Sequence, residues 1–197
     1  MKGFMKYYRN KYRINSLRLQ GFDYSKDGAY FITICTRKRE PFFGRIIKGK
    51  LQESEISKIC RSCWLDLPKH YNNCILDEFI IMPDHVHGII FLKNDNPVGA
   101  GFKPAPFKPA PGFRHQHDYR AGLKPAPTGD TILKPYSISE IIRGFKTFTA
   151  KMINEHDNTL GRKFWQTRFY DHIIRNDDEL IRIRKYIVNN PKQWEND

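Results

Sequence analysis

The pattern of hydrophobic and polar positions predicts four β-strands. Residues 29–36 form a β-branched and aromatic run, which is typical of a strand. Two further apolar runs, 74–82 and 85–92, are separated by only two residues, so we expect them to pair as a hairpin. The segment 164–175 is aromatic at its start and rich in isoleucine near its end, and we expect it to be the fourth strand.

Three other segments repeat their apolar residues at helical spacing. They cover 53–70, 137–153 and the stretch that follows residue 176. The last of them opens on a capping box, Asn176-Asp177-Asp178-Glu179. We expect this helix to end at Asn190-Pro191, because proline cannot continue the hydrogen bonding of a helix.

The order of these elements predicts an α+β fold. Strand, helix, two hairpin strands, helix and strand make up the split β-α-β layout of ferredoxin-like and RRM-like domains, an antiparallel four-stranded sheet with two helices on one face. A further C-terminal helix carries Tyr186. RNA-binding modules and small enzymes share this layout, so it does not by itself establish the function.

Composition divides the chain into three parts. Residues 1–20 form a basic N-terminal arm that contains no acidic residue. Residues 21–197 have the length of a single domain with a hydrophobic core. A stretch rich in Gly, Lys, Pro and Ala at about 94–135 interrupts this domain. It has too little apolar surface to fold alone, and we expect a flexible insertion.

The charge of the chain favours an anionic partner. Lys and Arg number 34 against 21 Asp and Glu, which gives a formal net charge of +13 at pH 7. Nucleic acid and membrane surfaces are both anionic, but 14 Phe and 10 Tyr suit a basic groove in which bases stack on rings. Because no apolar run is long enough for a signal peptide or a membrane span, we expect no membrane partner and a cytoplasmic location.

Two histidines are candidate metal ligands. His85 and His87 stand two apart on a predicted strand, so both rings project from the same face while Val86 points into the core. Two adjacent imidazoles can hold a divalent ion. The alternative is a pair of half-exposed strand histidines that only form hydrogen bonds.

The last predicted helix offers a candidate nucleophile. Tyr186 and Asn190 are four residues apart and therefore lie on one helical face. A tyrosine hydroxyl has a pKa near ~10 and is mostly neutral, but a nearby metal makes its attack on a phosphodiester easier. Taken alone, a tyrosine such as Tyr186 is more often a boundary residue that packs its ring and exposes its hydroxyl.

Three stretches together resemble the HUH-type single-tyrosine transposases. The stretch 82–89, MPDHVHGI, resembles the metal motif of that family. The stretch 164–176, FWQTRFYDHIIRN, resembles the segment before the tyrosine helix, and 183–191, IRKYIVNNP, resembles the helix itself. The branch that matches best is the REP-associated tyrosine transposases, and the resemblance spans about residues 12–93 and 137–194.

This resemblance implies a mechanism. His85, His87 and Asn190 would hold Mg²⁺ or Mn²⁺, and Tyr186 would attack the scissile phosphate to leave a 5′-phosphotyrosine and a free 3′-hydroxyl. The substrate would be single-stranded DNA beside a palindromic hairpin, and the protein would act as a monomer or a homodimer. Its cytoplasmic location would be of the bacterial type and associated with the nucleoid. The DNA phosphates would be contacted by cationic side chains of the arm and of the later elements: Arg9, Arg13, Arg18, Arg143, Lys146, Lys151 and Arg168.

Alternatives remain at the level of the sequence. Tyr170 could be the nucleophile in place of Tyr186, although a strand tyrosine is more often a packing or DNA-contact residue. His172 could assist the reaction or simply be partly buried. The whole protein could also be a non-catalytic nucleic-acid-binding regulator on the same fold. A zinc-stabilised module would need a fourth tight ligand that the sequence does not offer.

Overall fold

The computed structural model describes residues 22–94 and 135–194. The basic arm at 1–20, and with it Arg9, Arg13 and Arg18, lies outside the described residues. Almost all of the expected insertion at 94–135 does so as well.

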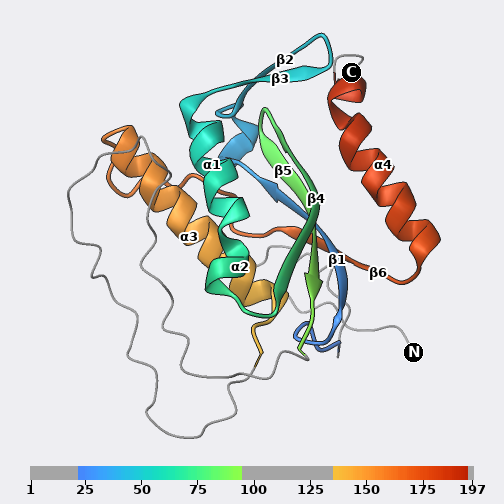
Figure 1. Cartoon of the computed structure of the whole chain (residues 1–197). Coiled ribbons are helices and arrows are strands. Elements are labelled where there is room, and N and C mark those ends of the chain that lie inside the picture. Colours follow the sequence, from blue (N-terminus) through green and yellow to red (C-terminus); the bar gives the residue numbers. More distant parts are fainter. Residues whose placement is uncertain (1–21, 95–134, 195–197) are drawn as a thin grey trace, which may run out of the picture.

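Four strands form one antiparallel sheet in the order β4-β5-β1-β6. They are β1 (Gly28–Cys35), β4 (Cys74–Met82), β5 (His85–Leu92) and β6 (Tyr170–Ile174). The tight turn between β4 and β5 makes them neighbours, as their spacing predicted. In the middle of the sheet, β1 pairs with β5 on one side and with β6 on the other (Figure 1).

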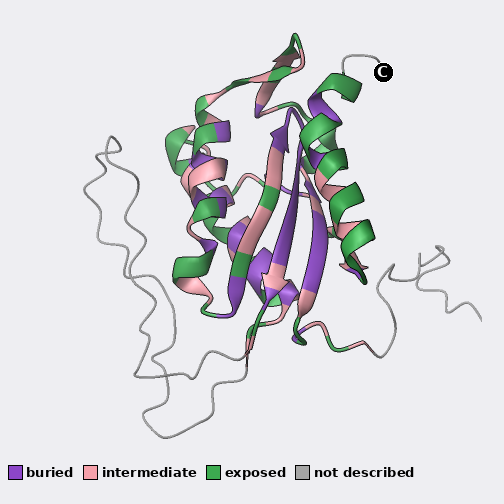
Figure 2. Ribbon diagram, turned by 45° about the vertical axis from the view of Figure 1, so that its right-hand side comes forward, coloured by how far each residue is buried: buried purple, intermediate pink, exposed green. Residues whose placement is uncertain are grey.

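Helices cover both faces of this sheet. The helices α1 (Glu55–Leu65), α2 (Leu67–His70) and α3 (Ile138–His156) lie on one side, and α4 (Asp177–Trp194) lies on the other (Figure 1). The central strands between them are mostly buried, while the outer surfaces of the helices are exposed (Figure 2). The α+β fold expected from the sequence, with a four-stranded antiparallel sheet and a C-terminal tyrosine helix, is therefore confirmed.

Alternation along β1 divides the core into two clusters. Tyr30, Ile32 and Ile34 face α1 and α3 and belong to the larger cluster. Phe31 points the other way and belongs to a smaller cluster with Ile187 of α4. Since successive strand residues face opposite sides, each residue of the central strands serves either the larger core or the α4 face.

A single glycine lets the larger core approach the strand that carries both candidate histidines. Gly88 follows His87 in β5 and faces α1, where a Cβ at this position would overlap the ring of the fully buried Trp64. Trp64 therefore packs directly against the β5 backbone. This close packing fixes β5 from the side opposite to its histidines.

The structure differs from the predicted elements at four places. The helix expected over 53–70 is broken into α1 and α2, and a hairpin of β2 (Gly44–Ile47) and β3 (Lys50–Glu53) precedes it. The fourth strand is shorter than 164–175, since only 170–174 pairs regularly.

The predicted end of the last helix at Asn190-Pro191 is wrong, because α4 continues through Pro191 to Trp194. Proline removes its own N–H from the helical ladder and its ring crowds the carbonyl four residues earlier, but near a C-terminus both effects are confined to the last turns. The buried Pro191 and the contact of Trp194 with His85 stabilise this last turn.

Candidate active site

His85 and His87 open β5 directly after the turn from β4. Each is only 5% exposed, so they are buried rather than half-exposed strand residues. Val86 between them packs in the larger core, as alternation predicted. The Nε2 atoms of the two imidazoles lie 3.0 Å apart and meet at one point on the α4 face of the sheet.

The other nitrogen of each ring is held by a neighbouring oxygen. The Nδ1–H of His85 donates to the Asp84 carboxylate at 2.5 Å, and Nδ1 of His87 contacts the Thr33 hydroxyl at 2.8 Å. These contacts fix the rotation of both rings. Oxygen partners of this kind are the usual support behind metal-binding histidines, because they leave Nε2 free to bind the ion.

Burial also sets the charge of the pair. Burial, followed by the neighbouring His85 and by Arg39, lowers the pKa of His87 from 6.5 to about 3. Burial lowers the pKa of His85 too, although its hydrogen bond to Asp84 opposes this effect. Near neutral pH both rings are therefore uncharged, and their Nε2 lone pairs are available to a cation.

Tyr186 reaches this pair from α4. Its hydroxyl lies 3.3 Å from Nε2 of His87, and its ring packs edge-on against Phe31. The residue is 42% exposed, so Tyr186 lies at the surface while its hydroxyl contacts a buried histidine.

Polar contacts at several points hold α4 on the sheet. Glu179 in its first turn contacts His172 of β6 at 2.9 Å, and Arg184 forms an ion pair with Asp77 of β4.

The cap at the start of α4 differs in part from the full capping box that the sequence predicted. The Asn176 side chain accepts from the Glu179 N–H at 2.8 Å, while the Glu179 carboxylate accepts from the N–H of Arg175.

Asn190 belongs to the same stripe of α4 as Tyr186. Residues four apart on a helix share a face, so Tyr186, Asn190 and Trp194 form one row. The first of these touches His87, and the ring of the last lies 5.6 Å from that of His85. Asn190 lies between these two residues along the helix and is 7% exposed, so it is buried on the face of α4 that meets the histidine pair.

The donor set fits a hard divalent ion that keeps other ligands. An octahedral ion with bonds of about 2.1 Å places adjacent donors about 3 Å apart, which is the separation of the two Nε2 atoms. Within residues 22–94 and 135–194, no group of three or more His, Cys, Asp or Glu could hold a metal. Two imidazoles and the Asn190 amide would thus leave positions for phosphate oxygens or water, unlike a closed zinc site.

Four site residues were not found from the sequence. Thr33, Asp84, Arg39 and Trp194 all contact the histidine pair or its supporting carboxylate. Only Asp84 carried a signal, since it directly precedes His85. Arg39, 3.5 Å from the Asp84 carboxylate, has a positive φ of 60°. Non-glycine residues rarely adopt this conformation, which is often found near functional sites.

The two alternative residues have different surroundings. Tyr170 in β6 is 44% exposed and pairs with Thr33 across the sheet, but the hydroxyl that lies 3.3 Å from His87 is that of Tyr186. His172 contacts Glu179 and so helps to hold α4 on the sheet.

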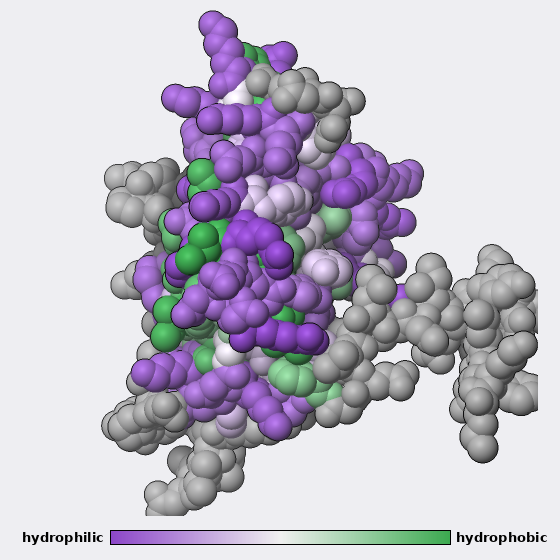
Figure 3. Space-filling view, turned by 90° about the vertical axis from the view of Figure 1, so that its right-hand side faces the viewer, coloured by the Kyte–Doolittle hydropathy of each residue, from purple (hydrophilic) through white to green (hydrophobic). Residues whose placement is uncertain are grey.

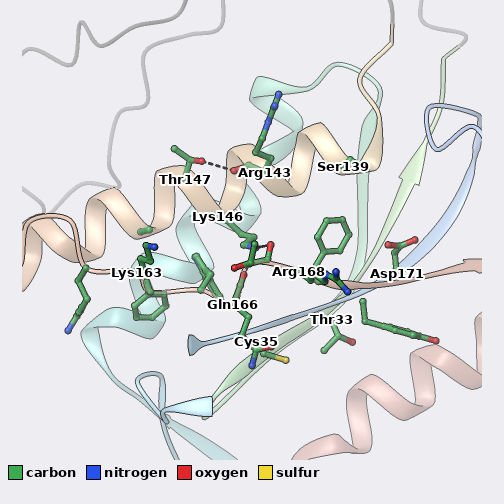
Figure 4. A pocket seen from close by; sticks show the side chains of 17 residues that line it. Thr33, Cys35, Ser139, Arg143, Lys146, Thr147, Lys163, Gln166, Arg168 and Asp171 are labelled. Atoms are coloured by element: carbon green, nitrogen blue, oxygen red, sulfur yellow. Dashed lines mark hydrogen bonds between the residues drawn. The ribbon is translucent and has the colours of Figure 1, made fainter. Parts of the chain in front are cut away.

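Of the predicted DNA-contact residues that are described, three share one groove. Arg143 and Lys146 of α3 and Arg168, from the segment before β6, line a groove of about 990 Å³ (Figure 4). The ammonium of Lys146 donates to the backbone carbonyls of Gln166 and Thr167 at 2.6 and 3.0 Å. Lys151 lies on α3 outside the groove lining, 4.0 Å from Glu155.

The face on which α4 lies is largely hydrophilic, with hydrophobic atoms in small separate patches (Figure 3). In the part of the chain that the structure describes, no helix has the length and apolar character needed to cross a membrane.

Three comparisons relate this chain to known proteins. The sequence profile of the family described as "Transposase IS200 like" matches residues 131–190, which include Tyr186 and Asn190. An uncharacterized protein of Haemophilus influenzae is 31% identical over 192 residues, which cover 98% of this chain and 96% of that protein. A solved REP-associated tyrosine transposase bound to a REP hairpin has a TM-score of 0.51 at 17% identity, over 90% of this chain and 74% of that chain. At that identity the structural similarity establishes the fold.

Proposed function

The chain belongs to the family of IS200-like transposases, and we propose that it cuts and rejoins single-stranded DNA at the site formed by His85, His87 and Tyr186. One observation carries this proposal. The hydroxyl of Tyr186, a residue that is 42% exposed, lies 3.3 Å from Nε2 of a buried histidine, and that atom lies 3.0 Å from Nε2 of a second one. A boundary tyrosine that only packs its ring has no need of such a pair.

Tyr186 would be the nucleophile. Its hydroxyl would lose a proton and its oxygen would form a bond to phosphorus. The bond from phosphorus to the 3′ oxygen would break and that oxygen would take up a proton, so that no proton is gained or lost overall. The products would be a 5′-phosphotyrosine and a free 3′-hydroxyl. Because one phosphodiester replaces another, the step is close to balanced in energy and can run backwards to rejoin a strand.

His85, His87 and Asn190 would hold Mg²⁺ or Mn²⁺. When bound, the ion would polarise the scissile phosphate and stabilise the charge that develops on it. The low pKa of His87, about 3, supports a role as ligand rather than as general base. A general base works best with a pKa near the working pH, and an imidazole this weak would hardly take the tyrosine proton.

A single chain would suffice for the chemistry. His87 of β5 and Tyr186 of α4 come together within one protomer, which supports action as a monomer. We propose hairpin-bearing single-stranded DNA as the substrate. The formal charge of +13 and the cationic groove support this, as does the solved relative that is bound to a REP hairpin.

A cleavage assay tests the function. The protein is incubated with a labelled single strand that contains a hairpin, with Mg²⁺, with Mn²⁺ or with chelator. We expect metal-dependent cutting that is lost in the His85→Ala, His87→Ala double variant while hairpin binding persists. Cutting should also be lost in Tyr186→Phe. Tyr136→Phe, which removes a hydroxyl from a tyrosine of similar exposure (41%), is its matched control and should still cut. Binding without cutting under all conditions would favour a regulatory DNA-binding protein instead.

A further inference from the structure

The edge of the sheet bulges just before β6. Thr36 pairs with Trp165, and Thr33 pairs with Tyr170. The two paired residues are three positions apart on β1 but five positions apart on the partner segment, so the partner segment has two extra residues between these pairs. Bulges of this kind at a sheet edge redirect side chains, and here the redirected residues include Arg168.

Lys146 supports this bulge. Figure 4 shows its side chain extending from α3 toward the segment that carries Gln166. Its ammonium donates to the backbone carbonyls of Gln166 and Thr167, while the N–H of Gln166 donates to the Cys35 carbonyl of β1. The bulge is therefore a fixed feature of this edge.

The groove along this edge reaches the candidate active site. Thr33 lines the groove and also contacts Nδ1 of His87 at 2.8 Å. Tyr170 lines it as well, and its ring lies 6.3 Å from Phe31, which in turn packs against Tyr186 at 6.1 Å between ring centroids. A strand bound in the groove could thus continue directly to the Tyr186 hydroxyl.

The lining has the chemistry of a single-strand site. It carries five cationic residues against one carboxylate, Asp171, and aromatic rings lie between them. Not all of these cations are equally available. Arg162 is paired with Asp157, and Arg143 extends away from the bulged segment in Figure 4. Arg168 is exposed and, among residues 22–94 and 135–194, forms no ion pair.

We propose that this groove holds the unpaired nucleotides next to the scissile phosphate, with one base stacked on Tyr170 and a phosphate on Arg168. The proposal rests on the proposed function, since it concerns the DNA that Tyr186 would cut. Tyr170 is 44% exposed, so its ring is accessible, and stacking requires a base that is not paired in a duplex. A volume of about 990 Å³ leaves room for more than one nucleotide.

Equilibrium binding without cleavage tests this assignment. The full chain with Tyr186→Phe is titrated in chelator onto three labelled DNAs: a blunt hairpin, and the same hairpin with about six unpaired nucleotides on the 5′ or on the 3′ side. We expect one flank to strengthen binding. Tyr170→Leu should abolish that gain, which means that its affinity for the flanked hairpin falls by roughly 5- to 150-fold. Its affinity for the blunt hairpin should be unaffected. Tyr170→Phe keeps the ring and should retain the gain.

Arg168→Gln should weaken binding of the same flanked DNA and reduce the slope of log affinity against log salt by about 0.7. The matched controls are Tyr136→Leu and Arg45→Gln, which replace an exposed tyrosine and an exposed arginine of β2, both outside the groove lining. Thermal midpoints check that each variant is folded.

The assignment is overturned if neither flank strengthens binding, if Tyr170→Leu weakens the blunt hairpin equally, or if the control variants have the same effect. Flank binding through Tyr170 in a protein that never cuts DNA would instead contradict the proposed function and leave the groove assignment intact.

Discussion

Replacing Asp84 with Asn tests how the histidine pair is supported. The buried Asp84 carboxylate accepts the His85 Nδ1–H at 2.5 Å and lies 3.5 Å from Arg39. The amide of Asn has the same shape and can still accept this hydrogen bond, but it carries no charge. The backbone carbonyl of Asp84, which accepts from the Thr36 N–H at 2.8 Å, is unchanged, so we expect the fold to persist.

The effect should appear in metal affinity. A carboxylate behind a ligating histidine makes Nε2 more basic, and its loss typically weakens metal binding by about 10- to 100-fold, or about 1.4–2.7 kcal/mol. We therefore expect the Mn²⁺ concentration for half-maximal cutting to rise by that factor in Asp84→Asn. The maximal rate at saturating Mn²⁺ should change much less.

A second Asp–His contact provides the control. Asp157 contacts Nδ1 of its neighbour His156 at 2.8 Å, at the end of α3 and outside the candidate site. Asp157→Asn should leave the Mn²⁺ midpoint unchanged. The reasoning fails if Asp84→Asn leaves the midpoint unchanged as well, or if both variants shift it equally.

Three further predictions follow from the packing and charge of the site. Gly88→Ala should lower the free energy of unfolding by about 1–3 kcal/mol in urea titrations, and Trp64→Phe should recover part of this loss by making room for the added Cβ. In chelator, the protein should lose stability as the pH falls below 6.5, because the unfolded chain then binds a proton that the folded His87, with a pKa of about 3, does not. The loss from this residue should reach about 2 kcal/mol at pH 5, and His87→Gln should remove it. Arg184→Met breaks the ion pair with Asp77. It should slow cutting while it leaves the thermal midpoint nearly unchanged, because the pair positions α4 and a surface ion pair contributes little to stability.

Each of these has a result that would contradict it. Full stability of Gly88→Ala would mean that the Trp64 ring can move aside. An unchanged pH dependence in His87→Gln would mean that His87 is not held neutral by burial. A large fall in the thermal midpoint of Arg184→Met, together with slower cutting, would point to general loosening of α4.

The sequence predicted the sheet well because its signal is local. Alternation of apolar residues places His85 and His87 on one face and Val86 on the other, and the structure has this arrangement. The meeting of His87 with Tyr186, 99 residues later in the chain, has no local signal. Periodicity could place each on its own element, and only the family resemblance brought them together.

The elements that the sequence missed depend on tertiary contacts. In the bulge before β6, Lys146, which is twenty residues away in the sequence, donates to two backbone carbonyls. Such a contact leaves no local signal, and the sequence pattern of the segment is that of a continuous strand. Likewise, Pro191 predicts a helix end by local rules, but packing on the sheet carries α4 to Trp194. Thr33 belongs to the site only through its pairing with β5, which no motif marks.

The central claim is that Tyr186 becomes joined to DNA, and the most direct measurement is the mapping of that bond. The protein is incubated with Mn²⁺ and a labelled hairpin-bearing single strand, the adduct is isolated under denaturing conditions, and the labelled peptide is sequenced by mass spectrometry. We predict a 5′-phosphate on Tyr186 and no adduct in Tyr186→Phe. A label on Tyr170, or an adduct that persists in Tyr186→Phe, would contradict the assignment of the nucleophile.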